Sequence, residues 1–123
     1  MKAEQKLYET DPEFMERFEH FAYVEVVKEE GRTLDEKTRV MDVLATLLGC
    51  QDLDVFKATL PEALDAGLSP VMIKETVYQA VDYLGIGRMY PFLGAVNEVL
   101  EERGVQLPLE GQATTTMENR LEK

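Results

Sequence analysis

Apolar residues recur every three or four positions along most of the chain, a pattern typical of amphipathic helices. Downstream of Pro12, the first such stripe consists of Phe14, Phe18, Phe21 and Val24. Thr10 or Asp11 is expected to cap this helix, because each side chain accepts hydrogen bonds from free backbone N–H groups. We expect the helix to end at Gly31 and to cover one side of the core.

Two further helices are expected to follow. The first opens at Asp35, a good capping residue, and closes at Gly49, with more than half of its circumference apolar. The second starts near Asp52 or Asp54. It contains Pro61, where a kink or a break is expected because proline lacks a backbone donor.

The fourth and fifth helices have clear boundary signals. Ser69 and Pro70 supply a cap and a first-turn proline for a helix that is predicted to end at Gly85. Pro91 fits the first turn of a fifth helix, which is expected to stop at Gly104. No segment alternates apolar and polar residues for long enough to form a sheet, so the pattern predicts an all-α fold.

The composition changes after Gly104. Residues 107–111 are expected to be extended or turn-like, and a small, polar stretch follows them at residues 112–116. Residues 117–123 hold too few apolar side chains to keep a short helix in place without a partner surface. We therefore expect one helical domain over residues 1–104 and a tail or linker over residues 105–123.

The charge balance argues against nucleic acid as a partner. The chain of 123 residues has 13 basic and 24 acidic side chains and a net charge of −11, whereas phosphate binding requires a concentrated cationic stripe. The longest mainly apolar run, residues 43–50, is far shorter than the roughly 20 residues that cross a bilayer. With a single cysteine and no apolar core of a signal peptide, we expect a cytoplasmic protein without membrane contact.

Several short segments occur in an order and spacing that resemble a known family. They are residues 34–39 (Leu-Asp-Glu-Lys-Thr-Arg), 65–69 (Asp-Ala-Gly-Leu-Ser), Glu75, Gln79 and 83–85 (Tyr-Leu-Gly). Through them the chain resembles the carboxymuconolactone decarboxylase and alkylhydroperoxidase-D superfamily. The closest resemblance is to the N-terminal module of its two-module members and the linker after it, through residues 49–52 (Gly-Cys-Gln-Asp), 83–88 (Tyr-Leu-Gly-Ile-Gly-Arg), 107–110 (Leu-Pro-Leu-Glu) and 114–116 (Thr-Thr-Thr). The resemblance implies an alkylhydroperoxidase-D-like orthogonal helical bundle that forms homo-oligomers, either trimers or hexamers, with pockets near the subunit boundaries.

The resemblance also implies what catalysis should require. The peroxidase-like branch uses a glutamate, a Cys-x-x-Cys pair and a histidine, and their places here hold Val40, Asp52 with Val55, and Thr59. A single cysteine cannot both attack a peroxide and resolve the resulting sulfenic acid within one chain. The decarboxylase branch keeps the histidine, and a threonine hydroxyl cannot replace imidazole as an acid or base near neutral pH. Both activities are therefore disfavoured.

The region around Gly85 and Gly87 is the predicted substrate-binding site, with Tyr83, Arg88 and Tyr90 as its residues and Thr59 as a further candidate. A guanidinium holds a carboxylate through two parallel hydrogen bonds, and glycine lets a ligand approach the backbone closely. The alternative stays open that the tyrosines belong to the core or to a subunit interface and that Arg88 forms an ordinary ion pair.

Cys50 is the candidate catalytic residue, since it lies two residues before the place of the family's first cysteine. A buried, inert side chain is the preferred alternative. His20 is interpreted as a surface histidine, and no metal site is predicted because no histidine or cysteine spacing suits one. Glu75 is expected to form a structural ion pair with Arg39.

Three functions remain open at this point. The first is binding or transformation of a small anionic metabolite, carboxylated or a lactone, without metal or organic cofactor; Arg88 would orient the carboxylate. The second is a single-cysteine, peroxidase-like redox protein in which Cys50 reacts once and an external thiol restores it. The third is a non-catalytic assembly subunit that supports a partner module.

Overall fold

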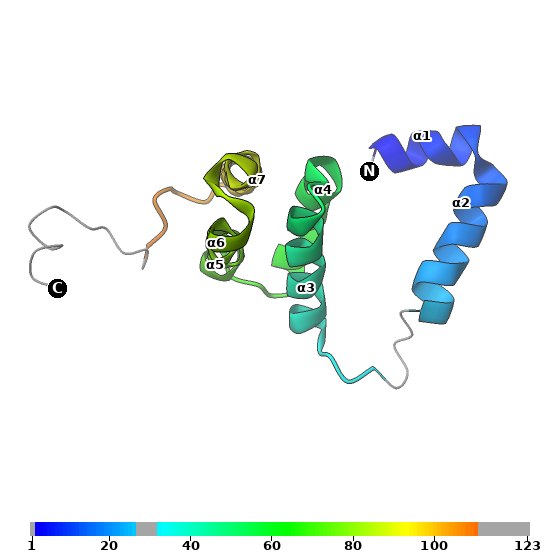
Figure 1. The fold of residues 1–123 in the computed structure, drawn as a ribbon, viewed down its shortest axis with the longest axis horizontal. Coiled ribbons are helices and arrows are strands. Elements are labelled where there is room, and N and C mark those ends of the chain that lie inside the picture. Colours follow the sequence, from blue (N-terminus) through cyan, green and yellow to red (C-terminus); the bar gives the residue numbers. More distant parts are fainter. Residues whose placement is uncertain (1, 27–31, 111–123) are drawn as a thin grey trace, which may run out of the picture.

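The computed structural model describes residues 2–26 and 32–110 of the chain, and within these ranges every regular element is a helix (Figure 1). In chain order the elements are α1 (Lys2–Thr10), α2 (Pro12–Glu19), the π-helical η1 (His20–Val26), α3 (Glu36–Gly49), α4 (Leu53–Asp65), α5 (Pro70–Gln79), α6 (Val81–Leu84) and α7 (Ile86–Glu102). The predicted all-α class is confirmed.

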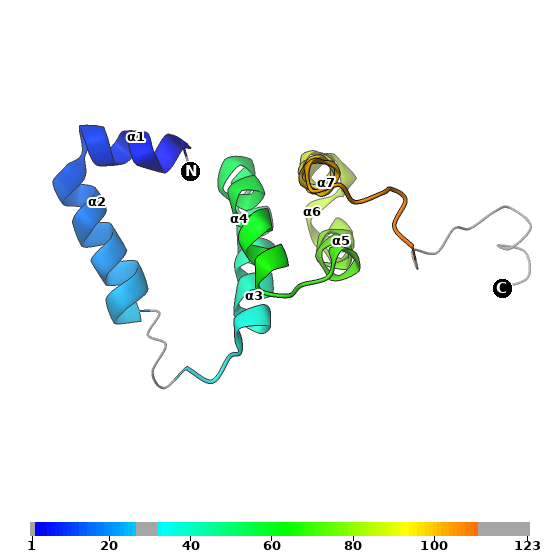
Figure 2. The ribbon, with the colours of Figure 1, turned by 180° about the vertical axis from the view of Figure 1, so that it is seen from behind.

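The hydrophobic core lies between α3, α4, α5 and α7. Each of these helices contributes fully buried side chains at spacings typical of a helix face, namely Val40, Leu44 and Leu48, then Phe56 and Leu60, then Ile73 and Val77, and finally Phe92, Val96 and Leu100. Figures 1 and 2 show α3 and α4 together in the middle, with α5, α6 and α7 on one side of them and α2 on the other.

Three helices of the core begin at the expected capping residues. The backbone N–H of Thr38 donates to Asp35 Oδ1 over 2.7 Å, and that of Met72 donates to Ser69 Oγ over 3.1 Å. Asp52 caps α4 in the same way, so of the two predicted starts of this helix the first is confirmed. The predicted end of α3 at Gly49 is confirmed as well.

Two prolines lie inside helices. The helix α4 continues through Pro61 to Asp65, so no break occurs there. The helix α7 begins at Ile86, whereas the sequence predicted a start at Pro91. Pro91 cannot donate to the carbonyl of Gly87 four residues earlier, but Gly87 is exposed, so water can satisfy that carbonyl.

The predicted fourth helix is divided into α5 and α6. The chain tightens at Ala80, whose N–H donates to the carbonyl of Val77 over 3.1 Å, and the N–H of Tyr83 in turn donates to the carbonyl of Ala80 over 3.2 Å. These bonds span three residues instead of four, so the helix axis is interrupted. The divided segment still ends at Gly85, as predicted.

The N-terminal arm, which we define as α1, α2 and η1, differs most from the sequence-based expectation. The sequence did not predict α1, which packs against α2, where Met15 is buried. Asp11 precedes α2, yet neither its side chain nor that of Thr10 makes a capping hydrogen bond, because Thr10 Oγ1 donates to Asp11 Oδ2 instead. The predicted end at Gly31 lies outside the described residues.

The apolar stripe of the arm is exposed, so the expectation that it covers the core is wrong. Phe14, Phe18, Phe21 and Val24 are 66%, 47%, 59% and 55% exposed. Phe14 and Phe18 stack on each other, with ring centroids 6.4 Å apart. The arm packs on itself and α2 stands apart from α3 and α4 in both views, which leaves the stripe uncovered.

The chain returns to the core after α7. Gly104, with φ of 77°, ends the helical region as predicted. Beyond it Val105 and Leu107 are partly buried against the core and Leu109 is buried. Residues 105–110 therefore pack on the helical body, whereas the segment 117–123 lies outside the described part of the chain.

Candidate functional site

The predicted substrate-binding residues lie on the surface where α6 meets α7. Gly85 turns the chain between the two helices with φ of 86°, a conformation that residues with a Cβ rarely adopt. Around it Tyr83, Ile86 and Tyr90 are 91%, 51% and 59% exposed, and Arg88 is exposed too. We call Tyr83, Ile86, Arg88 and Tyr90 the α6–α7 patch; its tyrosines do not belong to the core of the chain.

Arg88 differs from the other arginines of residues 2–26 and 32–110 because it forms no ion pair. Each of the others is paired with a carboxylate: Arg17 with Glu13, Arg32 and Arg39 with Glu36, and Arg103 with Asp65. The ordinary ion pair that was the alternative for Arg88 is therefore not formed within the described part of the chain. Its guanidinium remains available for an external carboxylate.

Cys50 is exposed at the corner between α3 and α4, so the preferred interpretation of a buried side chain is wrong. Its Sγ donates to the carbonyl of Leu47 over 3.5 Å. A helix turns by about 100° per residue, which carries Cys50 roughly 200° away from the buried Leu48. The nearest cation along the chain, Lys57, is paired with Glu98, and this hydrogen bond raises the pKa of Lys57.

The residues at the family's catalytic places have structural surroundings. Val40 is buried in the core and Asp52 caps α4. Thr59 is half-buried in α4, and its hydroxyl donates to the carbonyl of Val55 over 2.7 Å. This bond to the preceding turn occupies the proton of Thr59. Its oxygen keeps a lone pair but is no acid or base near neutral pH.

No hydrogen bond or ion pair joins Cys50, Thr59 and the α6–α7 patch within the described residues. The helix α4, which contains Thr59, nevertheless contacts the helix α7, which contains Arg88. Phe56, early in α4, contacts Phe92, early in α7, and Asp65 at the end of α4 pairs with Arg103 just after α7 over 2.8 Å. These two contacts hold α4 against α7.

Arg39 has different partners from the one predicted. It donates to Glu36 of its own helix over 2.7 Å and to Glu62 of α4 over 3.4 Å, whereas the expected pair with Glu75 is not formed. Glu36 lies one turn earlier on α3, within direct reach of Arg39. Its hydrogen bond raises the pKa of Arg39 and lowers that of Glu36. This cluster is a surface link between α3 and α4.

His20 has the surface position that the sequence predicted. Its side chain is 62% exposed and lies on η1, with Nε2 3.4 Å from Glu25 Oε1. In the ranges that the structure describes, no group of three or more histidine, cysteine, aspartate or glutamate side chains is placed to hold a metal ion. In the same ranges no helix has the length and apolar character to cross a membrane.

Lys74 is a residue of interest that the sequence analysis missed. It is only 6% exposed, and within the described residues its ammonium group has neither a hydrogen-bond partner nor a carboxylate partner. Burial lowers its pKa. The methylene chain of Lys74 is therefore packed among apolar residues. The available signal was its position in α5, between the apolar residues Ile73 and Val77.

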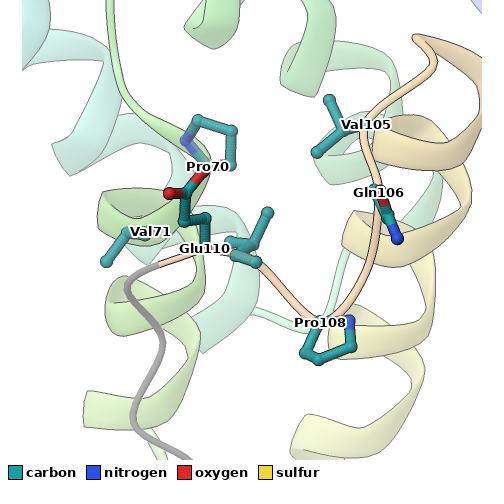
Figure 3. A pocket seen from close by; sticks show the side chains of 7 residues that line it. Pro70, Val71, Val105, Gln106, Pro108 and Glu110 are labelled. Carbon is teal, nitrogen blue, oxygen red and sulfur yellow. The ribbon is translucent and has the colours of Figure 1, made fainter.

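A groove of about 530 Å³ lies away from these candidates, between the start of α5 and the segment after α7 (Figure 3). It is lined by Pro70, Val71, Val105, Gln106, Pro108, Leu109 and Glu110. Its only acidic or basic side chain is that of Glu110, which disfavours an anionic ligand. None of the predicted site residues lines it.

One of three comparisons with known proteins identifies the family of the chain. Residues 12–98 match the model of the carboxymuconolactone decarboxylase family. The match extends from the start of α2 into the second half of α7 and includes Cys50, Thr59 and the α6–α7 patch. The chain has no match among curated proteins or solved structures. Since the family model covers well over half of the sequence, this chain belongs to the carboxymuconolactone decarboxylase family.

Proposed function

We propose that this family member binds a small carboxylated or lactone metabolite at the α6–α7 patch. The observation that carries the proposal is Arg88, whose guanidinium stays free in a chain with a net charge of −11 while the other described arginines are paired. A free guanidinium matches a carboxylate with two parallel hydrogen bonds, so the protein itself supplies the positive charge for binding.

The surroundings of Arg88 suit a small ligand. Arg88 lies in the first turn of the 17-residue helix α7, where unpaired backbone N–H groups favour an anion. Nothing lies within 4 Å of the place where a Cβ on Gly87 would be, so a ligand has room beside the backbone. Tyr83 precedes Arg88 in the chain and Tyr90 follows it, and the hydroxyl groups of these exposed tyrosines can form hydrogen bonds with a ligand.

The proposed activity is to bind and orient the ligand, and proton transfer is not part of the proposal. Thr59 stands where the decarboxylase branch has its histidine, and its hydroxyl is bonded to Val55. An exposed ion pair contributes only about 0–1 kcal/mol, whereas a dissociation constant of 1 mM corresponds to about −4.1 kcal/mol, so the ion pair with Arg88 alone would bind a monocarboxylate more weakly than millimolar.

Ligand titration followed by NMR tests the proposal. Succinate, adipate and γ-butyrolactone serve as probes, and we expect the amide signals of Gly85, Gly87 and Arg88 to shift with the two carboxylates most strongly. Arg88→Ala should abolish these shifts, and Arg88→Lys should weaken them because an ammonium group lacks the planar fork. Arg103→Ala is the matched control, since Arg103 is already paired with Asp65. Absence of binding, or unchanged binding by Arg88→Ala, would refute the proposal.

A role as an assembly subunit is the second candidate function. It is favoured by the N-terminal arm, whose phenylalanines are exposed at spacings that normally indicate a buried face. Co-purification of the tagged chain with a histidine- or cysteine-containing member of the same family would support this role. Purification of the chain with no family member other than itself would count against it.

A further inference from the structure

The groove beside the start of α5 takes no part in the proposed function (Figure 3). One wall is the first turn of α5, with Pro70 and Val71, and the other is the segment after α7. Its volume of about 530 Å³ lies within the range of about 300–1,000 Å³ that is typical of small-molecule sites. This groove, which we call the α5 groove, therefore has room for a small molecule.

Contacts with the helical body hold both walls of the α5 groove in place. The backbone N–H of Val105 donates to the carbonyl of Leu100 over 2.9 Å, and Leu109 is only 7% exposed. On the opposite wall, the hydroxyl of Ser69 caps the first turn of α5. A ligand therefore meets a groove whose walls are already formed.

The lining of the α5 groove is mostly apolar and stiff. Five of its seven residues are apolar, and four of these five are Pro70, Val71, Val105 and Pro108. Proline has no side-chain rotamers to lose on binding, and the branched valine side chain has few. Little conformational entropy is lost when such side chains are covered, so the lining favours a ligand with a compact apolar body.

The polar part of the lining is suited to a cation. Glu110 is exposed and has no hydrogen bond or ion pair with any other residue of the ranges 2–26 and 32–110. Figure 3 shows it on the same side of the groove as Pro70. An ionised carboxylate only accepts hydrogen bonds, and Pro70 and Pro108 lack the backbone N–H that an anion would need. An ammonium group supplies the missing charge and the missing donors.

We propose that the α5 groove binds a small primary amine with a compact apolar body. Such an amine is protonated at neutral pH, and its ammonium group donates to Glu110 while its apolar part lies against Val71, Val105 and Leu109. Apolar burial supplies most of the affinity, because an exposed ion pair strengthens binding by no more than about fivefold. The net charge of −11 also attracts a cation to this chain.

Three probes with the same cyclohexyl ring test the site by NMR. Cyclohexylmethylamine is a cation, cyclohexylmethanol is neutral and cyclohexanecarboxylate is an anion. We expect nuclear Overhauser effects from the ring of the amine to the methyl groups of Val71, Val105 and Leu109, and binding of the amine about two- to fivefold tighter than that of the alcohol. The inference is overturned if the amine does not contact these methyl groups, or if the alcohol or the carboxylate binds there as tightly.

Glu110→Gln tests the role of the carboxylate, because it removes the charge and keeps the shape of the side chain. The affinity for the amine should fall to that for the alcohol, and the affinity for the alcohol should stay the same. Glu75→Gln is the matched control, since it removes an equally exposed charge from α5 at a residue that does not line the groove. Equal losses in the two variants would trace the attraction to the net charge and overturn the contact with Glu110.

This inference does not rest on the proposed function, and Arg88→Ala separates the two. The variant should bind cyclohexylmethylamine like the wild type, because Arg88 does not line the α5 groove. Binding of the amine by a wild-type protein that binds neither succinate, adipate nor γ-butyrolactone refutes the proposed function alone. Binding of those three probes by a wild-type protein that does not bind the amine refutes this inference alone.

Discussion

Phe56 of α4 meets Phe92 of α7 edge to face, with ring centroids 5.0 Å apart and ring planes at 81°. Both side chains are fully buried, and this arrangement is one of the favoured geometries for aromatic pairs. The contact joins the helix that contains Thr59 to the helix that contains Arg88. It therefore fixes the position of the α6–α7 patch relative to the rest of the core.

Replacement of Phe56 by alanine should destabilise the protein strongly. The exposed fraction of Phe56 is 0%, and removal of a buried phenylalanine typically lowers the free energy of unfolding by about 3–5 kcal/mol because a cavity remains. Urea unfolding followed by circular dichroism measures the loss. Tyr83→Ala, at a 91% exposed aromatic residue, is the control and should change the free energy of unfolding by no more than about 0.5 kcal/mol. Equal losses for the two variants would contradict the assigned core.

Lys74→Met should stabilise the protein at neutral pH, because the substitution removes a charge that desolvation by the surrounding residues disfavours and keeps an apolar chain of similar length. We expect the melting temperature at pH 7 to rise by roughly 2–5 °C. Burial lowers the pKa of Lys74 below its usual 10.5, so between these two values the unfolded chain binds more protons than the folded one. Stability should therefore rise with pH in that window.

The pH dependence provides the stricter check on Lys74. The rise in stability in the alkaline window should be present in the wild type and absent from Lys74→Met. Lys6→Met, at an exposed lysine of the arm, should keep both the wild-type melting temperature and the wild-type pH dependence. If Lys74→Met melts at a lower temperature than the wild type at pH 7, the ammonium group has a stabilising partner in solution.

Asp35 should contribute to the loss of stability in acid. The hydrogen bond from the backbone N–H of Thr38 lowers the pKa of Asp35 below its usual value of 3.8. The stabilisation by the carboxylate is therefore complete above pH 3.8 and is lost as the pH falls through the lowered value. Thermal melts between pH 6 and pH 2 should show a smaller acid loss for Asp35→Asn, which caps a helix without ionising. An identical acid profile for the two proteins would show that this cap does not titrate.

The thiol of Cys50 should be accessible to reagents in solution but should not react with peroxide as a peroxidase thiol does. Because the thiol is exposed, a maleimide should label it in the folded protein as fast as in the unfolded chain. No cation contacts it within the described residues, so mild peroxide should yield no sulfenic acid that dimedone can trap. Mass spectrometry detects both adducts, with Cys50→Ser as the blank. A dimedone adduct at Cys50 would revive the single-cysteine redox function.

Local signals were sufficient for most helix boundaries. Asp35 and Ser69 cap helices where the sequence predicted, because capping depends on a few neighbouring residues. Gly49 is the last residue of α3, and Gly104, with a left-handed backbone, follows the end of α7. The start of α7 before Pro91 was not predictable in this way. It depends on the turn at Gly85, which frees the following residues to continue the helix.

Tertiary placement was the part that sequence patterns could not provide. A stripe such as Phe14, Phe18 and Phe21 indicates a face that favours burial, but it does not say which surface will cover it. The same limit applied to Cys50, whose exposure depends on the corner after α3. The position of Arg88 at a turn was predictable, whereas its lack of a partner required the positions of the surrounding carboxylates.

The helices α3 and α4 lie between the N-terminal arm and the α6–α7 patch. Substitutions on these two surfaces are therefore separated by the core, and sites that share no partners usually act independently. The effects of a substitution in the arm and of one in the patch on the free energy of unfolding should add.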